Sequence, residues 1–167
     1  LLPEVYLQLG AFGSAGEALA NLADSQQDSG DLAESVATFG SSADAYRSAG
    51  LSIEEAASLF AQGEIYLRLD EQENARQSFT NSVDSDPLGQ LAPRAYFLIG
   101  DAAIAAGETD AAVAAFIQGA RSHQRSGNLE EASWVLAQAP HPRPQLQAAL
   151  VSGILIFMHS ESTFVLW

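Results

Sequence analysis

Hydrophobic residues recur along most of the chain at helical intervals. Between residues 73 and 83, Ala75, Phe79 and Val83 stand four residues apart, which places them in one stripe along a helix. The preceding segment, 58–69, also has its apolar side chains at helical spacing. Apart from the C-terminal tail, no segment alternates apolar and polar residues in the way that a half-buried strand does. The pattern therefore predicts an all-α protein.

The pattern also repeats along the chain. A shift of 40 residues superposes similar residues in the first half, and a shift of 37 does so further on. The matched pairs are Tyr6 and Tyr46, Gly10 and Gly50, Leu19 and Leu59, and Phe39 and Phe79 for the first shift, and Gly63 and Gly100, Ala75 and Ala112, and Phe79 and Phe116 for the second. A period of this length indicates stacked units, each of which buries its apolar face against the next.

Glycine and proline mark the ends of the predicted helices. Pro87 ends one helix, since proline disfavours helical geometry in the residue before it, and Pro93 begins the next. Glycines stand between other predicted helices, at positions 30, 50, 107 and 127. Each unit is thus predicted to be a hairpin of two helices.

These breaks predict the domain organisation. Residues 1–10 are expected to be the end of a preceding helix or hairpin, 11–139 to hold the repeats, and 140–167 to form a proline-rich break and an apolar C-terminal tail. The repeats divide at about 11–50, 51–89 and 90–127, followed by a partial unit at 128–139.

The longest apolar run lies in the tail, at 148–158. It is shorter than the roughly 20 residues that a membrane-spanning helix needs. The simpler interpretation is a capping segment that is buried on the last repeat. The alternative is a tail at a membrane interface, ending at 164–167, but the polar residues 160–162 interrupt it. Membrane contact is therefore disfavoured.

The two central units share a set of small and aromatic positions. These are Leu59, Gly63, Tyr66, Ala75, Phe79 and Pro87 in one unit, and Tyr96, Ile99, Gly100, Gly107, Ala112 and Phe116 in the next. Gln62 occupies a position where leucine is expected, and the first unit retains only Leu19, Gly30 and Phe39. This pattern resembles the tetratricopeptide repeat (TPR), over roughly residues 10–139.

The resemblance implies a TPR-like superhelix, which is an α-solenoid of stacked antiparallel helix hairpins. The spacing of 37 to 40 residues exceeds the usual 34 of this repeat, as in the long-helix variety of bacterial regulators and SNARE adaptors. The glycine and alanine positions are expected to let the two helices of a hairpin approach closely. The phenylalanines are expected to fill the space towards the next hairpin.

Composition excludes several classes of function. The chain has 167 residues, is 47% hydrophobic and carries a formal charge of −14, with arginine as its only strongly basic residue. A packed domain is consistent with this apolar fraction, whereas general nucleic-acid binding is excluded by the charge. The absence of cysteine excludes disulfides, thiolate metal sites and cysteine nucleophiles. No signal-peptide pattern follows Leu1, which favours a cytoplasmic protein, although a removed signal would leave no trace.

The negative charge is concentrated in the first units. Residues 1–90 hold 15 acidic side chains and 3 arginines, whereas residues 91–167 hold 6 acidic side chains and 4 arginines. A basic partner is therefore expected to bind the first two hairpins.

The resemblance further implies that the first helix of each unit lines a concave groove. One column of groove positions holds Asp24, Glu64 and Asp101, a second holds Ala20, Phe60 and Phe97, and a third holds Asp28, Arg68 and Ala105. The predicted partner-binding residues are Asp24, Phe60, Glu64, Arg68, Phe97 and Asp101. They suit an extended or helical peptide with arginine or lysine and an apolar anchor. The alternative is that these acids are only solvated on an exposed helix face.

Other sites lack support. The clamp for a C-terminal carboxylate that one TPR subclass forms with lysine and asparagine is disfavoured, because the corresponding residues are aromatic and acidic. The glycines of 10–16 lack the spacing of a dinucleotide loop, and His123, His141 and His159 lack metal-ligand spacing. Acidic pairs such as Glu54–Glu55 suit the first turn of a helix. No cofactor, metal or catalytic residue is expected.

The sequence therefore predicts a non-catalytic scaffold for protein–protein interaction, with a protein or peptide in its groove and possible contact with further repeats of a longer chain. The alternative is a sensor module of a larger bacterial signalling or transcription-regulator protein.

Overall fold

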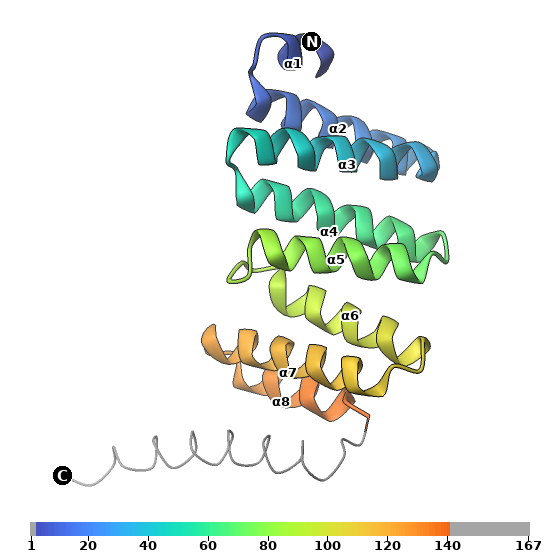
Figure 1. The fold of residues 1–167 in the computed structure, drawn as a ribbon, viewed down its shortest axis with the longest axis vertical. Helices are drawn as coiled ribbons and strands as arrows, with labels where there is room; N and C mark the ends of the chain where they lie inside the picture. The colour runs from blue at the N-terminus through green and yellow to red at the C-terminus, as the bar shows by residue number, and fades with distance from the viewer. Residues whose placement is uncertain (1–2, 141–167) are drawn as a thin grey trace, which may run out of the picture.

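The computed structural model describes residues 3–140, and every regular element in this part of the chain is a helix. The helices are α1 (Pro3–Gln8), α2 (Phe12–Ser29), α3 (Leu32–Ala49), α4 (Ser52–Arg68), α5 (Gln72–Ser85), α6 (Ala92–Ala105), α7 (Thr109–Arg125) and α8 (Leu129–Gln138). They stack in chain order along one axis, and successive long helices run in opposite directions (Figure 1). Predictions for 141–167, including most of the apolar tail, lie outside the described residues.

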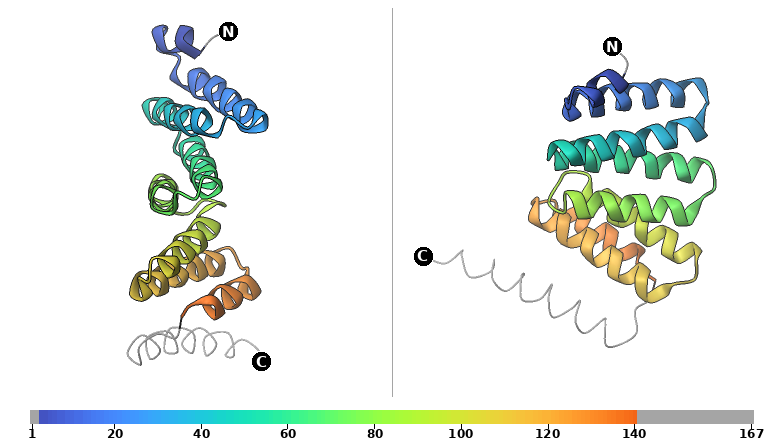
Figure 2. Two further views of the ribbon diagram at one scale, coloured as in Figure 1. Left: turned by 90° about the vertical axis from the view of Figure 1, so that its right-hand side faces the viewer. Right: turned by 45° about the horizontal axis from the view of Figure 1, so that its top comes forward.

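Helices pack in hairpins, and each hairpin packs on the next. Within hairpins α2 contacts α3, α4 contacts α5 and α6 contacts α7, while α3–α4, α5–α6 and α7–α8 contacts join them. A view along the side of the stack places α2 and α4 in one layer and α3 and α5 in the other (Figure 2). This arrangement is the predicted α-solenoid of antiparallel helix hairpins.

The turns between helices need a left-handed backbone. Gly30 and Gly107, in the turns after α2 and α6, have φ angles of 89° and 75°. Asp70 takes the same place after α4 with a φ of 61°, and is the non-glycine residue with positive φ in the described part. Aspartate is one of the few side chains that tolerate this conformation.

Aromatic rings fill the space that the helical glycines leave. A Cβ atom on Gly63 would lie 2.6 Å from the ring of Phe79, and one on Gly100 would lie 2.8 Å from the ring of Phe116. Both rings are fully buried. Phe79 also belongs to a core cluster with Ala92 of the next hairpin, and Phe116 to one with Val135 of α8, so both phenylalanines join neighbouring units as expected.

The first hairpin uses a different pair. There a Cβ atom on Gly16 would lie 2.7 Å from the ring of Tyr46, which is 9% exposed. Burial raises the pKa of the Tyr46 phenol, and the charges of Glu17 and Glu54 raise this pKa further. The sequence repeat did not reveal this contact, because the family's glycine position holds Ala23 in this unit.

Gln62 replaces the expected leucine with hydrogen bonds. Its Nε2 atom donates to the Val36 carbonyl oxygen of α3 at 3.0 Å, and its Oε1 atom accepts from the Ser78 hydroxyl of α5 at 3.0 Å. The amide fits beside Gly40, where a Cβ atom would lie 2.9 Å from Nε2. The departure from the family pattern therefore links three helices.

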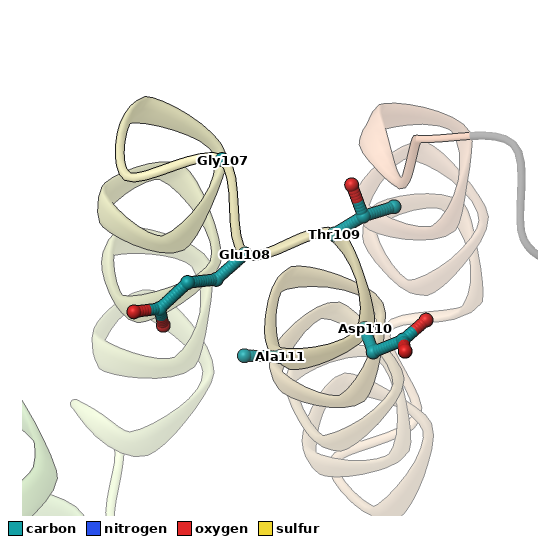
Figure 3. Close-up of a pocket in the computed structure, with 5 residues that line it drawn as sticks. All are labelled: Gly107, Glu108, Thr109, Asp110 and Ala111. Carbon is teal, nitrogen blue, oxygen red and sulfur yellow. The ribbon is translucent and has the colours of Figure 1, made fainter.

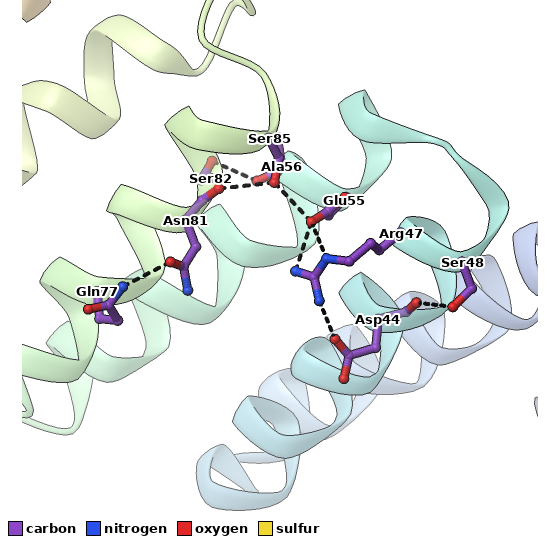
Figure 4. A network of polar contacts seen from close by, with 9 residues as sticks. All are labelled: Asp44, Arg47, Ser48, Glu55, Ala56, Gln77, Asn81, Ser82 and Ser85. Carbon is purple, nitrogen blue, oxygen red and sulfur yellow. Dashed lines mark hydrogen bonds and ion pairs between the residues drawn. The ribbon is translucent and has the colours of Figure 1, made fainter.

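A buried carboxylate links the same three helices (Figure 4). Glu55 of α4 is 8% exposed and its Oε1 atom accepts from Arg47 of α3, with Nε at 2.9 Å and Nη2 at 2.8 Å. The Ser85 hydroxyl of α5 donates to the same oxygen at 2.9 Å. Arg47 also pairs with the exposed Asp44 at 2.7 Å. The charge of Glu55 is thus satisfied from both neighbouring helices.

Candidate functional site

The predicted acidic column lies on the first helices of the three hairpins, and its members have different surroundings. Asp24 of α2 is exposed, and its side chain makes no hydrogen bond or ion pair with any other described residue. Its neighbour Ala23 is fully buried, so the chain turns Asp24 outwards while the helix packs on α3. Asp24 is therefore accessible to a partner.

Glu64 of α4 is already paired within the chain. Its Oε1 atom lies 2.5 Å from Nη2 of Arg94, a residue of α6. The guanidinium carbon of Arg94 lies 5.2 Å from the centre of the Phe60 ring, within the range of a cation–π contact. Phe60 is only 4% exposed and its ring also packs against Phe79, with 5.2 Å between the centroids. Phe60 therefore belongs to the core, and of the two phenylalanines predicted as the apolar anchor, Phe97 is the one that is partly exposed.

Arg68 stands in the last turn of α4 and is exposed, and its guanidinium makes no hydrogen bond or ion pair with another described residue. A positive charge at this position is stabilised by the negative end of the helix dipole. Its placement is consistent with either a contact to a partner or a role confined to the helix terminus.

Phe97 and Asp101 are neighbours one turn apart on α6. The Phe97 ring is partly exposed and lies 5.6 Å from the ring of Phe116, and it stacks on Trp134 of α8 with 5.1 Å between centroids and 27° between planes. The Asp101 carboxylate has no hydrogen bond or ion pair with the described residues. Partial burial raises the pKa of the Asp101 carboxyl. Phe97, Asp101 and Trp134 therefore form an exposed aromatic and acidic surface.

Two residues of this region were missed by the sequence analysis. Arg94 gave no signal, since nothing in the repeat pattern marks which arginine reaches back to the previous hairpin. Trp134 did have a signal, because a shift of 37 residues carries Phe60 to Phe97 and Phe97 to Trp134. Extending the column of Phe60 and Phe97 by one step would have found it.

A separate hollow lies at the turn between α6 and α7, lined by Gly107, Glu108, Thr109, Asp110 and Ala111 (Figure 3). The Glu108 carboxylate is bound by Arg76 of α5, with Nη1 2.5 Å from Oε2. Arg76 also pairs with Glu73, and both carboxylates raise the pKa of the guanidinium, Glu73 most. The hollow thus borders an ion-pair network that ties α5 to the turn between α6 and α7, and we assign it no ligand.

The described residues contain no group of three or more histidine, aspartate or glutamate side chains that could hold a metal ion. Nor is any helix between residues 3 and 140 long and apolar enough to cross a bilayer. What this part of the chain presents is a stack of helix hairpins with an exposed charged surface, which defines a helical-repeat protein of the kind that binds other proteins.

Comparison with known families identifies the repeat. The model of the tetratricopeptide repeat matches residues 56–87 and 93–122, so the predicted resemblance is confirmed for these two units, which are tetratricopeptide repeats. Such repeats generally serve as modules for protein interaction. Comparison with the curated proteins gives no match.

One solved structure supports the fold, and a second is described beside it for comparison only. The crystal structure of BtubC (BKLC) from P. vanneervenii has a TM-score of 0.50 and 13% identity, over 78% of this chain and 67% of that one. The crystal structure of MamA has a TM-score of 0.31 and 16% identity, over 83% of this chain and 92% of that one. At 13% identity the first shows the fold alone, and the second carries no argument.

Proposed function

We propose that the protein is a non-catalytic scaffold that binds a partner peptide or protein along α2, α4 and α6, which we call the first-helix face. The partner carries arginine or lysine together with apolar residues. The observation that carries this proposal is that Asp24 and Asp101 have no partner within the described residues, whereas Glu64 is paired with Arg94. The face thus retains acidic groups that an incoming basic chain can neutralise.

The charge of the whole chain supports the same partner. A formal charge of −14 attracts basic chains over a distance of about a Debye length, which is roughly 10 Å at 0.1 M salt. The partly exposed Phe97 supplies an apolar contact beside Asp101. A cytoplasmic location and the absence of catalytic activity stay predictions that accompany this proposal.

The test compares two peptides with the same apolar residues, one carrying arginines and the other glutamates at the same positions. Fluorescence anisotropy of the labelled peptides measures binding. We expect the arginine peptide to bind, with an affinity that falls as salt is added, and the glutamate peptide not to bind.

Two matched sets of variants remove negative charge, one from the first-helix face and the other from the second helices of the hairpins. Replacing both Asp24→Asn and Asp28→Asn on α2 should weaken binding of the arginine peptide about three- to tenfold, because two exposed carboxylates are lost. The control is Asp84→Asn on α5, an exposed carboxylate of the second-helix layer without a partner among the described residues, and it should leave the affinity unchanged. Equal binding of both peptides, or equal effects of both variants, would contradict the proposal.

A further inference from the structure

Arg94 shows how this surface holds a guanidinium group. Its Cζ atom lies over the Phe60 ring at 5.2 Å from the centroid, and its Nη2 atom lies 2.5 Å from the Glu64 carboxylate. Phe60 and Glu64 are four residues apart, so the ring and the acid lie on the same face of α4. The contact combines a cation–π interaction with an ion pair.

The same pair recurs one hairpin later, but without its arginine. Phe97 and Asp101 are again four residues apart, now on α6. The residue 37 positions after Arg94 is Glu131, an exposed residue in the first turn of α8. Glu131 of α8 therefore places a second carboxylate at the position that corresponds to the Arg94 guanidinium on α6. Asp101 consequently keeps no partner among the described residues.

Trp134 completes this surface. One face of its indole stacks on Phe97, yet the residue is 55% exposed, so the other face is open to solvent. Glu130 and Glu131 precede Trp134 by four and three residues, which places both acids on the same side of α8 as the indole. Indole is the side chain that binds cations most strongly through its ring.

We propose that Trp134, Asp101 and Glu131 form a binding site for an arginine side chain of the partner, in which the guanidinium stacks on the open face of the indole and pairs with the two carboxylates. This site rests on the proposed function and names one contact of it. The planar guanidinium carries five N–H donors and stays charged, so it can stack and pair at once. Lysine offers a compact ammonium without a planar face, and is expected to bind more weakly.

The readout is the fluorescence of Trp134 in a Trp167→Phe parent, which leaves it as the single tryptophan of the chain. The probes are three peptides that differ at one position, which is arginine, lysine or the neutral isostere citrulline. We expect the arginine peptide to change the Trp134 emission and to bind about five- to tenfold more tightly than the citrulline peptide, with the lysine peptide in between.

The variants act on the carboxylates and leave the apolar packing intact. Asp101→Asn should remove most of the difference between the arginine and citrulline peptides. Glu131→Arg should abolish it, because the chain then supplies its own cation, as it does at Arg94. Asp84→Asn serves again as the control and should leave the difference intact. Trp134→Phe should reduce the difference in affinity between the arginine and citrulline peptides, measured by fluorescence anisotropy. A circular dichroism melt of each variant shows whether the helices remain folded.

Equal affinity for the arginine and citrulline peptides in the parent would overturn the site. If those peptides still bound through the carboxylates of α2, the proposed function would stand without it, whereas the absence of any binding would remove both. A tighter complex on Arg143→Gln alone would show that the chain's own arginine occupies the site and would overturn it. Sedimentation showing a dimer that Asp101→Asn dissociates would assign the arginine to a second copy, with the same consequence.

Discussion

At the scale of single residues, the two central hairpins are built on a pairing of glycine with phenylalanine. The rings of Phe79 and Phe116 occupy the volume that a side chain at Gly63 or Gly100 would need. The sequence predicted that these glycines let two helices approach closely. The structure shows that each glycine also leaves room for a phenylalanine ring to pack against the helix backbone. A fully buried ring in a close-packed core has little room to move away.

This packing predicts that Gly63→Ala destabilises the protein. The new Cβ atom would lie 2.6 Å from Phe79, so the ring or the helix must shift, at a cost of about 1–3 kcal/mol in the free energy of unfolding. Urea denaturation followed by circular dichroism measures it. The matched control is Gly13→Ala in α2, where a Cβ atom would lie 3.2 Å from the flexible Cδ1 end of the exposed Leu51 and better helix propensity offsets its displacement. An equal loss in both variants would argue against the ring as the cause.

At the scale of elements, side chains from α4 hold the first hairpin to the second. Gln62 bonds to α3 and α5 through its amide, and Glu55 does so through its carboxylate. Neither link is apparent in the repeat pattern, in which Gln62 looks like a defect and Glu55 like an acid favouring a helix N-terminus. A polar group buried between helices is stabilising only while its partners remain.

The Glu55 link predicts that Arg47→Gln is more costly than the exposure of Arg47 suggests. The substitution leaves a carboxylate that is 8% exposed with the Ser85 hydroxyl as its remaining donor, and should lower the free energy of unfolding by about 1–3 kcal/mol. Asp44→Asn removes the other, exposed partner of Arg47 and should change stability by less than about 0.5 kcal/mol. Urea midpoints of the two variants compare them. Equal midpoints would mean that the buried carboxylate does not depend on Arg47.

At the scale of the whole molecule, negative charge is spread along a thin stack of helices. Among the described residues, Arg47, Arg76 and Arg94 form ion pairs with acidic side chains, but most acidic residues of this part lie outside these pairs. Repulsion among like charges in a folded chain opposes folding, because the unfolded chain holds them further apart.

Screening of this repulsion is expected to stabilise the fold. The urea midpoint should rise between about 0.02 M and 0.5 M potassium chloride, since the Debye length shrinks over this range to less than the spacing of most surface charges. The exposed ion pairs weaken in the same salt, but pairs of this kind contribute little, about 0–1 kcal/mol each. A midpoint that falls with salt would show that the ion pairs outweigh the repulsion.

Helix hairpins, their turns and their core columns could be predicted from the sequence. Apolar spacing determines which face of a helix is buried, and glycine between two such segments marks a left-handed turn. These are local properties, so Gly30, Gly107 and the stripe from Ala75 to Val83 were identified without coordinates. The repeat itself made the order of packing predictable, since each unit must bury its apolar face on its neighbours.

The partners of the polar groups were decided only by the tertiary structure. Asp24, Glu64 and Asp101 occupy one column of the sequence, yet within residues 3–140 only Glu64 meets an arginine, because Arg94 reaches back from the next hairpin and no equivalent residue of this part reaches Asp101. Whether two side chains from different helices meet depends on the rotation and offset of those helices and on the length of the side chains, which local spacing does not encode. For the same reason the accessible aromatic surface lies at Phe97 and Trp134, while Phe60 is enclosed in the core.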